Sequence, residues 1–151
     1  MQILKVKFVL KLSWQLFERA YMKNIKQSVL IVDDDPDILI TAGGLFNMMG
    51  FEVHTASNGI EAIEFMEKSA KHIAVLFSDV VMPNGVNGIS LGRAVRKHMP
   101  DIKIILCSGY SLPSTEVETD LNGFAFVKKP YRFNDLVEAI QKMGLNIMTM
   151  K

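Results

Sequence analysis

The chain is poor in cysteine, which excludes a fold held together by disulfides. Its single cysteine, Cys107, has no partner for an internal disulfide. It lies in the apolar run 104–107, where a buried thiol is more common than a reactive one. This cysteine use is compatible with a reducing compartment. We therefore expect a cytoplasmic protein stabilised by an apolar core.

Long hydrophobic runs are also missing. No stretch of about twenty consecutive apolar residues occurs, which argues against a membrane-spanning helix. The N-terminal segment is apolar but interrupted by lysines every few positions. It has neither the clean apolar centre nor the small-residue cleavage site of a signal peptide.

Neither sign of charge dominates the chain, but the charges are unevenly placed. Residues 1–26 contain six lysines and arginines and one acidic residue, Glu18. Apolar and polar residues alternate over much of this segment, which favours a strand, with a basic amphipathic helix as the alternative. Because a second methionine, Met22, stands shortly before the first expected strand, the segment is either an upstream extension that is not always translated or an element that binds a membrane surface or a partner.

From Ser28 onward, short apolar runs alternate with amphipathic segments of helical length. This alternation is typical of βαβ units that build a parallel sheet, and 151 residues suffice for one such core. The pattern predicts strands at 29–32, 52–56, 74–77, 103–107 and 125–127, and helices at 37–49, 59–69, 88–98, 114–120 and 133–143. We divide the chain into an N-terminal extension (1–26), one domain (27–145) and a short tail (146–151).

Polar side chains follow four of these strands, and the carboxyl ends of parallel strands border one crevice. They are Asp33, Asp34 and Asp35 after the first strand, Ser78 and Asp79 after the third, Ser108 after the fourth, and Lys128 and Lys129 after the fifth. Clustered carboxylates repel one another unless a cation intervenes, and oxygen donors favour Mg²⁺. A carboxylate beside Mg²⁺ can attack a phosphoryl group while a lysine and a hydroxyl stabilise its oxygens.

Two of these residues have simpler interpretations. Asp35 is expected to cap the first helix of the domain, with Pro36 at the first helical position. Lys128 is expected to be a solvated charge at the end of its strand.

Four motifs occur in the order and spacing found in response-regulator receiver domains, and residues 27–145 resemble that family. The motifs are Val32-Asp33-Asp34, Asp79-Val80-Val81-Met82-Pro83, Ser108-Gly109-Tyr110 and Lys129-Pro130. The resemblance implies an α/β, flavodoxin-like fold, with a doubly wound five-stranded parallel sheet in the order 2-1-3-4-5 and five flanking helices. It implies these roles: Asp79 as phosphoacceptor; Asp33, Asp34, Asp79 and the carbonyl of Val81 as Mg²⁺ ligands; Ser108 as the switch hydroxyl; and Lys129 as the paired cation.

The chain departs from the usual family pattern at three places. The loop 84–88 is one residue longer, as in receivers attached to hybrid histidine kinases. Phe126 stands where the family often has a switch tyrosine, so the ring lacks a hydroxyl. Val81 and Tyr110 correspond to positions that control access to the phosphoryl site, and their bulk leads to the hypothesis of a long-lived phosphoaspartate.

The implied function is signalling: a histidine kinase or histidine phosphotransfer protein phosphorylates Asp79, and a conformational switch reaches an effector protein. The chain would then be no enzyme beyond catalysing its own phosphorylation and dephosphorylation. A dimer through the fourth expected helix and the fifth strand is compatible with the family. No direct nucleic-acid contact is expected, because only residues 144–151 follow the last helix. The alternatives are a haloacid-dehalogenase-like phosphatase with Asp33 as nucleophile, and a phosphorylation-independent interaction module.

Overall fold

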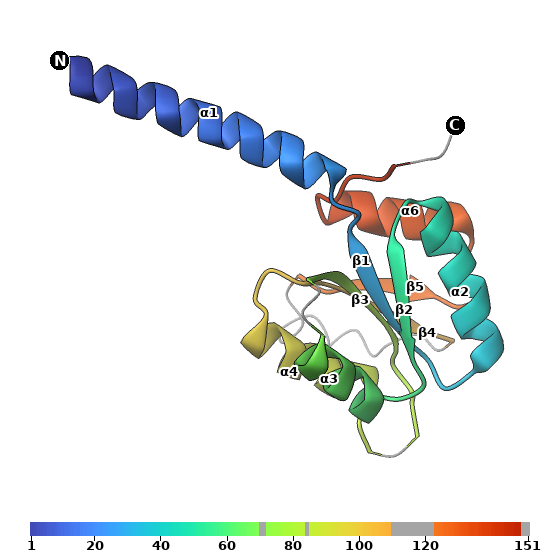
Figure 1. Cartoon of the computed structure of the whole chain (residues 1–151). Coiled ribbons are helices and arrows are strands. Elements are labelled where there is room, and N and C mark those ends of the chain that lie inside the picture. The colour runs from blue at the N-terminus through green and yellow to red at the C-terminus, as the bar shows by residue number, and fades with distance from the viewer. Residues whose placement is uncertain (70–71, 84, 110–122, 149–151) are drawn as a thin grey trace.

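A parallel five-stranded sheet in the order β2-β1-β3-β4-β5 forms the centre of the computed structural model (Figure 1). The structure describes residues 1–69, 72–83, 85–109 and 123–148. The strands are β1 (Ser28–Val32), β2 (Glu52–Ala56), β3 (Ile73–Asp79), β4 (Lys103–Ser108) and β5 (Ala125–Lys128). The predicted fold class and strand order are confirmed.

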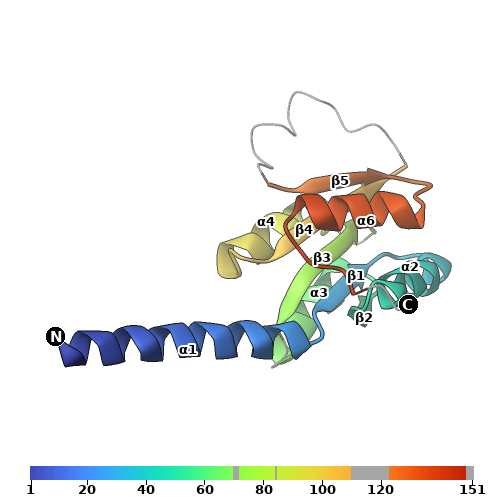
Figure 2. The same cartoon turned by 90° about the horizontal axis from the view of Figure 1, so that it is seen from above.

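Helices cover both faces of the sheet, as Figure 2 shows from a second direction. Those described beside the sheet are α2 (Pro36–Met48), α3 (Gly59–Lys68), α4 (Gly88–His98) and α6 (Phe133–Lys142). Helices α2 and α6 pack on one face, and α3 and α4 pack on the other. The helix expected at 114–120 lies outside the described residues.

The central strands are buried on both faces, which explains their unbroken apolar sequences. In β1, Val29 and Ile31 contact the apolar layer under α2 and α6. Leu30 and Val32 contact the layer under α3 and α4. All four side chains are fully buried. The sheet therefore has a separate apolar layer on each side.

Capping residues begin and end the helices near the positions that the sequence indicates. The side chain of Asp35 accepts a hydrogen bond of 2.9 Å from the backbone N–H of Asp37, and Pro36 is the first helical residue. Asn58 caps α3 in the same way. Gly50, after α2, has a φ of 89°, a conformation that favours glycine. The expected cap at Asp35 is confirmed.

Residues 2–24 form a helix, α1 (Gln2–Asn24), so the favoured strand interpretation is wrong and the alternative helix is correct. A single strand leaves its backbone N–H and C=O groups unpaired, whereas a helix pairs them within the segment. Helix α1 extends away from the sheet, and residues 1–21 are all exposed (Figure 1). None of the described helices is apolar over a length that could cross a bilayer.

The segment after α6 packs back onto the domain beside the end of α2. Leu145 and Ile147 contact the apolar layer on the α2 and α6 side. The backbone N–H of Met148 donates a 3.1 Å hydrogen bond to the carbonyl of Met49. The chain is therefore packed on the domain as far as Met148.

Deleting residues 1–24 should change the free energy of unfolding of the domain by less than about 0.5 kcal/mol, because exposed residues away from packed features contribute little. Urea denaturation of the full chain and the shortened chain measures this difference. A loss of more than about 1 kcal/mol would show that α1 packs on the domain.

Candidate functional site

The carboxyl ends of β1, β3, β4 and β5 bring the predicted polar residues to one edge of the sheet. Val32 pairs with Ser78, so Asp33 and Asp79 follow neighbouring positions of β1 and β3. The backbone N–H of Lys129 donates a 2.9 Å hydrogen bond to the carbonyl of Ser108. Parallel pairing therefore places the ends of four strands side by side.

The ammonium of Lys129 joins the two acidic side chains. Its Nζ lies 2.8 Å from Oδ2 of Asp33 and 3.1 Å from Oδ2 of Asp79. Burial opposes the charge of Lys129, but its hydrogen bonds to Asp33 and Asp79 raise its pKa above the ordinary value. One lysine thus stays charged between two carboxylates.

Asp79 is held in its protonated form more readily than an ordinary aspartate. Burial is the main cause that raises its pKa, and the nearby charge of Asp33 acts in the same direction. The hydrogen bond and charge of Lys129 oppose this rise without cancelling it. The site therefore has an excess of negative charge when Asp33 and Asp79 are both ionised.

The two carboxylates differ in their accessibility. Oδ2 of Asp33 binds Lys129, its Oδ1 accepts a 3.0 Å hydrogen bond from the backbone N–H of Asp35, and its side chain is only 3% exposed. The side chain of Asp79 is 13% exposed, and its Oδ1 has only a long, 3.4 Å contact with the N–H of Val81. Asp79 is therefore the carboxylate that an incoming group can reach.

The backbone of Asp79 is fixed by contacts that the sequence did not reveal. The hydroxyl of the buried Ser78 donates to the carbonyl of Asp79 at 2.9 Å. A Cβ added at Gly88 would lie 2.0 Å from the same carbonyl oxygen. The one signal in the sequence that could have indicated this close approach is a glycine at the start of a helix, where its helix propensity is poor.

Two further side chains lie beneath the carboxylates. Burial raises the pKa of Cys107 to about 12, so it remains a neutral thiol, as its apolar surroundings predicted. Tyr131, which the sequence analysis missed, packs edge-on against Phe77 with ring centroids 5.5 Å apart. No described residue hydrogen-bonds to its buried hydroxyl.

The other predicted site residues have different surroundings. Ser108 is 6% exposed at the end of β4, and Phe126 in β5 is 39% exposed. Asp34 and Val81 are exposed, and Val81 lies two residues after Asp79. Tyr110 lies outside the described residues. The hypothesis that Val81 and Tyr110 prolong the life of a phosphoaspartate stays a prediction.

The donor atoms suit a hard divalent cation. Within the described residues, ligand atoms of Asp33, Asp79 and Cys107 lie within 4.8 Å of one another. Carboxylate oxygens favour Mg²⁺, and a thiol that keeps its proton does not compete as a ligand. The single ammonium of Lys129 does not balance two carboxylates, so an additional cation would relieve their repulsion.

Comparisons with known proteins agree with this geometry. The family model of the response regulator receiver domain matches residues 29–141. The sensor kinase CckA of Brucella abortus is 33% identical over 127 residues, which are 83% of this chain and 13% of CckA. The chemotaxis protein CheY of Thermotoga maritima is 32% identical over 118 residues, or 77% of this chain and 96% of CheY.

A solved structure also resembles the chain closely. The crystal structure of response regulator protein TrrA from Thermotoga maritima in complex with Mg²⁺-BeF has a TM-score of 0.64 at 29% identity. The match covers 78% of this chain and 98% of that one. Because the family model matches most of its residues and the chain covers 96% of CheY at 32% identity, the chain belongs to the response regulator receiver domain family of two-component phosphorelays.

Proposed function

We propose that this receiver domain is a phosphoacceptor that takes a phosphoryl group on Asp79 and acts in the cytoplasm. The donor would be the phosphohistidine of a histidine kinase or of a histidine phosphotransfer protein. The observation that carries the proposal is the accessible carboxylate of Asp79. It lies beside Lys129 and beside Asp33, whose two oxygens both accept hydrogen bonds.

In the transfer step, a carboxylate oxygen of Asp79 attacks phosphorus and the bond between phosphorus and the donor's histidine nitrogen breaks. The product is an acyl phosphate on Asp79, and the histidine leaves with the electron pair of the broken bond. Lys129, whose Nζ lies 3.1 Å from Asp79, provides a positive charge for the phosphoryl oxygens.

The acidic residues have a supporting role. Asp33, Asp34, Asp79 and the carbonyl of Val81 would hold Mg²⁺, which when bound neutralises charge on the phosphoryl oxygens. Asp33 also fixes Lys129 through the 2.8 Å contact between Oδ2 and Nζ. The structure of the related TrrA is a complex with Mg²⁺-BeF, which supports the choice of Mg²⁺ as the cation.

Signalling would follow from the added charge at Asp79. We propose that the Ser108 hydroxyl binds the phosphoryl group and that Phe126 moves inward, which alters the surface offered to an effector protein. Ser108 is the last residue of β4, next to the strand that ends in Asp79, and Phe126 in β5 is 39% exposed.

The phosphatase alternative requires Asp33 as nucleophile, and the geometry does not favour it. Both oxygens of Asp33 are occupied by protein donors, and the side chain is almost completely buried. A nucleophile must present an accessible oxygen to its substrate, and the side chain of Asp79 is 13% exposed whereas that of Asp33 is 3% exposed.

Incubation with acetyl phosphate and Mg²⁺ should add one phosphoryl group to the chain, detected by intact mass. Asp79→Asn should abolish the adduct, because the amide is no nucleophile, and a chelator should suppress it in the unchanged protein. Asp101→Asn is the matched control, because it removes an exposed carboxylate that is not part of the site, and it should be phosphorylated normally.

The opposite results are equally clear. An adduct that survives in Asp79→Asn would move the acceptor elsewhere. Steady phosphate release without an adduct, dependent on Asp33 and not on Asp79, would establish the phosphatase. If neither adduct nor phosphate release is detected, the chain is a phosphorylation-independent interaction module.

A further inference from the structure

Helix α1 exposes a stripe of large apolar side chains for which the receiver function has no use. Ile3, Val6, Leu10, Trp14, Phe17 and Tyr21 are all exposed. At 3.6 residues per turn, their spacing places them within an arc of about 80°, whereas the exposed side chains of Leu4, Phe8, Val9, Leu12 and Leu16 lie outside it. Ring centroids 5.9 Å apart join Trp14 to Phe17 and Phe17 to Tyr21, so the aromatic side chains adjoin along the helix. The stripe runs most of the length of α1.

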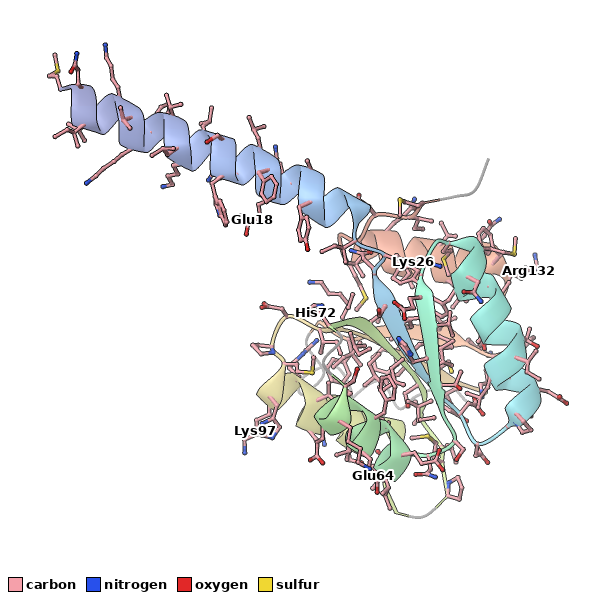
Figure 3. The ribbon with its side chains drawn as sticks, in the orientation of Figure 1. Glu18, Lys26, Glu64, His72, Lys97 and Arg132 are labelled. Atoms are coloured by element: carbon pink, nitrogen blue, oxygen red, sulfur yellow. The ribbon has the colours of Figure 1, made fainter. Side chains whose placement is uncertain are left out.

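The same helix has an excess of positive charge. Lys5, Lys7, Lys11 and Arg19 are exposed, and Glu18 is the one acidic residue among residues 1–26. None of these four cations forms an ion pair with a described residue. Figure 3 shows the side chains of α1, with Glu18 labelled, pointing outward around a helix that stands clear of the domain. The rest of the chain has more acidic than basic residues.

We infer that α1 binds in the plane of an anionic lipid bilayer surface. Its apolar stripe would enter the boundary between headgroups and acyl chains, and its lysines and arginine would contact lipid phosphates. The long stems of Lys7 and Lys11 let their ammonium groups reach the headgroups while the neighbouring apolar residues are buried. The charge of the helix is complementary to that of the lipid.

A second copy of α1 would cover the exposed apolar stripe less favourably than lipid would. Pairing two helices in either direction would bring mainly cations together, because each helix has only Glu18 to offer as a counter-charge. An anionic surface instead satisfies the apolar stripe and the cations together. Since none of the described helices is apolar enough to cross a bilayer, α1 would lie on the surface.

Membrane binding through α1 is compatible with access to the phosphoacceptor. Helix α1 leads into the amino end of β1 at Ser28, whereas Asp33 follows the carboxyl end of the same strand (Figure 1). The length of β1 therefore separates the attachment of α1 from Asp33 and Asp79. A partner protein could reach Asp79 while α1 is bound.

Trp14 provides a direct test, because it is the only tryptophan in the chain and its fluorescence reports on α1 alone. The full chain is titrated with vesicles of phosphatidylcholine mixed with phosphatidylglycerol, and with vesicles of phosphatidylcholine alone. We expect a blue shift of the Trp14 emission and co-sedimentation with the anionic vesicles only. High salt should weaken the binding, because it screens the attraction between the lysines and the lipid.

Two variants separate the charge contribution from the apolar one. The triple substitution Lys5→Gln, Lys7→Gln, Lys11→Gln should weaken partitioning on the order of 100-fold, since each lysine near an anionic surface contributes roughly fivefold. Leu10→Gln with Phe17→Gln keeps the charge and Trp14, and should also reduce binding strongly. The matched control, Lys68→Gln, Lys97→Gln, Lys142→Gln, removes the same charge from the domain surface and should bind as the unchanged chain does.

Three results would overturn the inference. The first is an unchanged Trp14 emission with no co-sedimentation. The second is equal binding to neutral vesicles. The third is a shift that depends on protein concentration without lipid, together with a doubled mass in light scattering and no vesicle binding, which would identify a second copy as the occupant. All of these measurements use unphosphorylated protein, so they are independent of the proposed role of Asp79.

Discussion

Replacing Lys129 by methionine should lower the free energy of unfolding by about 3 kcal/mol at neutral pH, because removing one partner leaves a buried carboxylate unpaired. Methionine keeps most of the apolar stem, so the loss reports on the charge. Asp33, whose side chain is 3% exposed, would lose its 2.8 Å contact with Nζ, and its repulsion of Asp79 would be uncompensated.

The loss in Lys129→Met should depend on pH in a defined direction. Because the folded-state pKa of Lys129 is raised, its charge stabilises the unchanged protein below its unfolded-state pKa, and this contribution is lost only as the pH rises through the folded value. The raised pKa of Asp79 means that its ionisation opposes folding as the pH rises through that value. Protonation at acidic pH removes the repulsion, so the deficit of the variant should shrink there.

Urea denaturation at neutral and acidic pH measures this effect. Lys128→Met is the matched control, since Lys128 is the adjacent lysine at the end of β5 and is exposed. It should change stability by less than about 0.5 kcal/mol. Adding Asp33→Asn to Lys129→Met removes the unpaired charge and should restore part of the loss. Equal losses in the two lysine variants would contradict the central role of Lys129.

Replacing Gly88 by alanine should disturb stability and phosphorylation together. The added Cβ would lie 2.0 Å from the carbonyl oxygen of Asp79 and 3.1 Å from Oγ of Ser78. Either the start of α4 or the backbone of Asp79 must move, and overpacking of this kind costs roughly 1–3 kcal/mol. We expect a cost near the upper end of that range, because the nearest atom belongs to the backbone.

The phosphorylation rate separates a local effect on Asp79 from a general loss of stability. We expect Gly88→Ala to slow adduct formation from acetyl phosphate at a temperature where the variant is fully folded. Gly44→Ala in α2 is the matched control, because no atom lies within 4 Å of the added Cβ. That change should raise stability by about 0.5–1 kcal/mol through helix propensity. A Gly88→Ala chain with unchanged stability and rate would refute the close approach.

Much of the fold followed from the sequence because its signals are local. Strands buried on both faces need unbroken apolar runs, and Val29 to Val32 form such a run. Asp35 and Pro36 mark the start of α2 because a helix leaves its first N–H groups unpaired, and a nearby side-chain oxygen can satisfy one of them. Segment 1–26 was ambiguous because its apolar residues fit a period of two and a helical stripe equally well.

The sequence by itself determined which residues lie at the carboxyl edge of the sheet, since parallel strands place their ends together whatever their side chains do. Only the tertiary structure decided their partners. Lys129 and Asp33 are separated by 96 positions, and the contact between them depends on the packing of β5 and β1 into one sheet. Both oxygens of Asp33 accept hydrogen bonds, and Gly88 fits against Asp79, only because atoms lie at the right positions to within a few tenths of an ångström. No pattern of residue types specifies positions so finely.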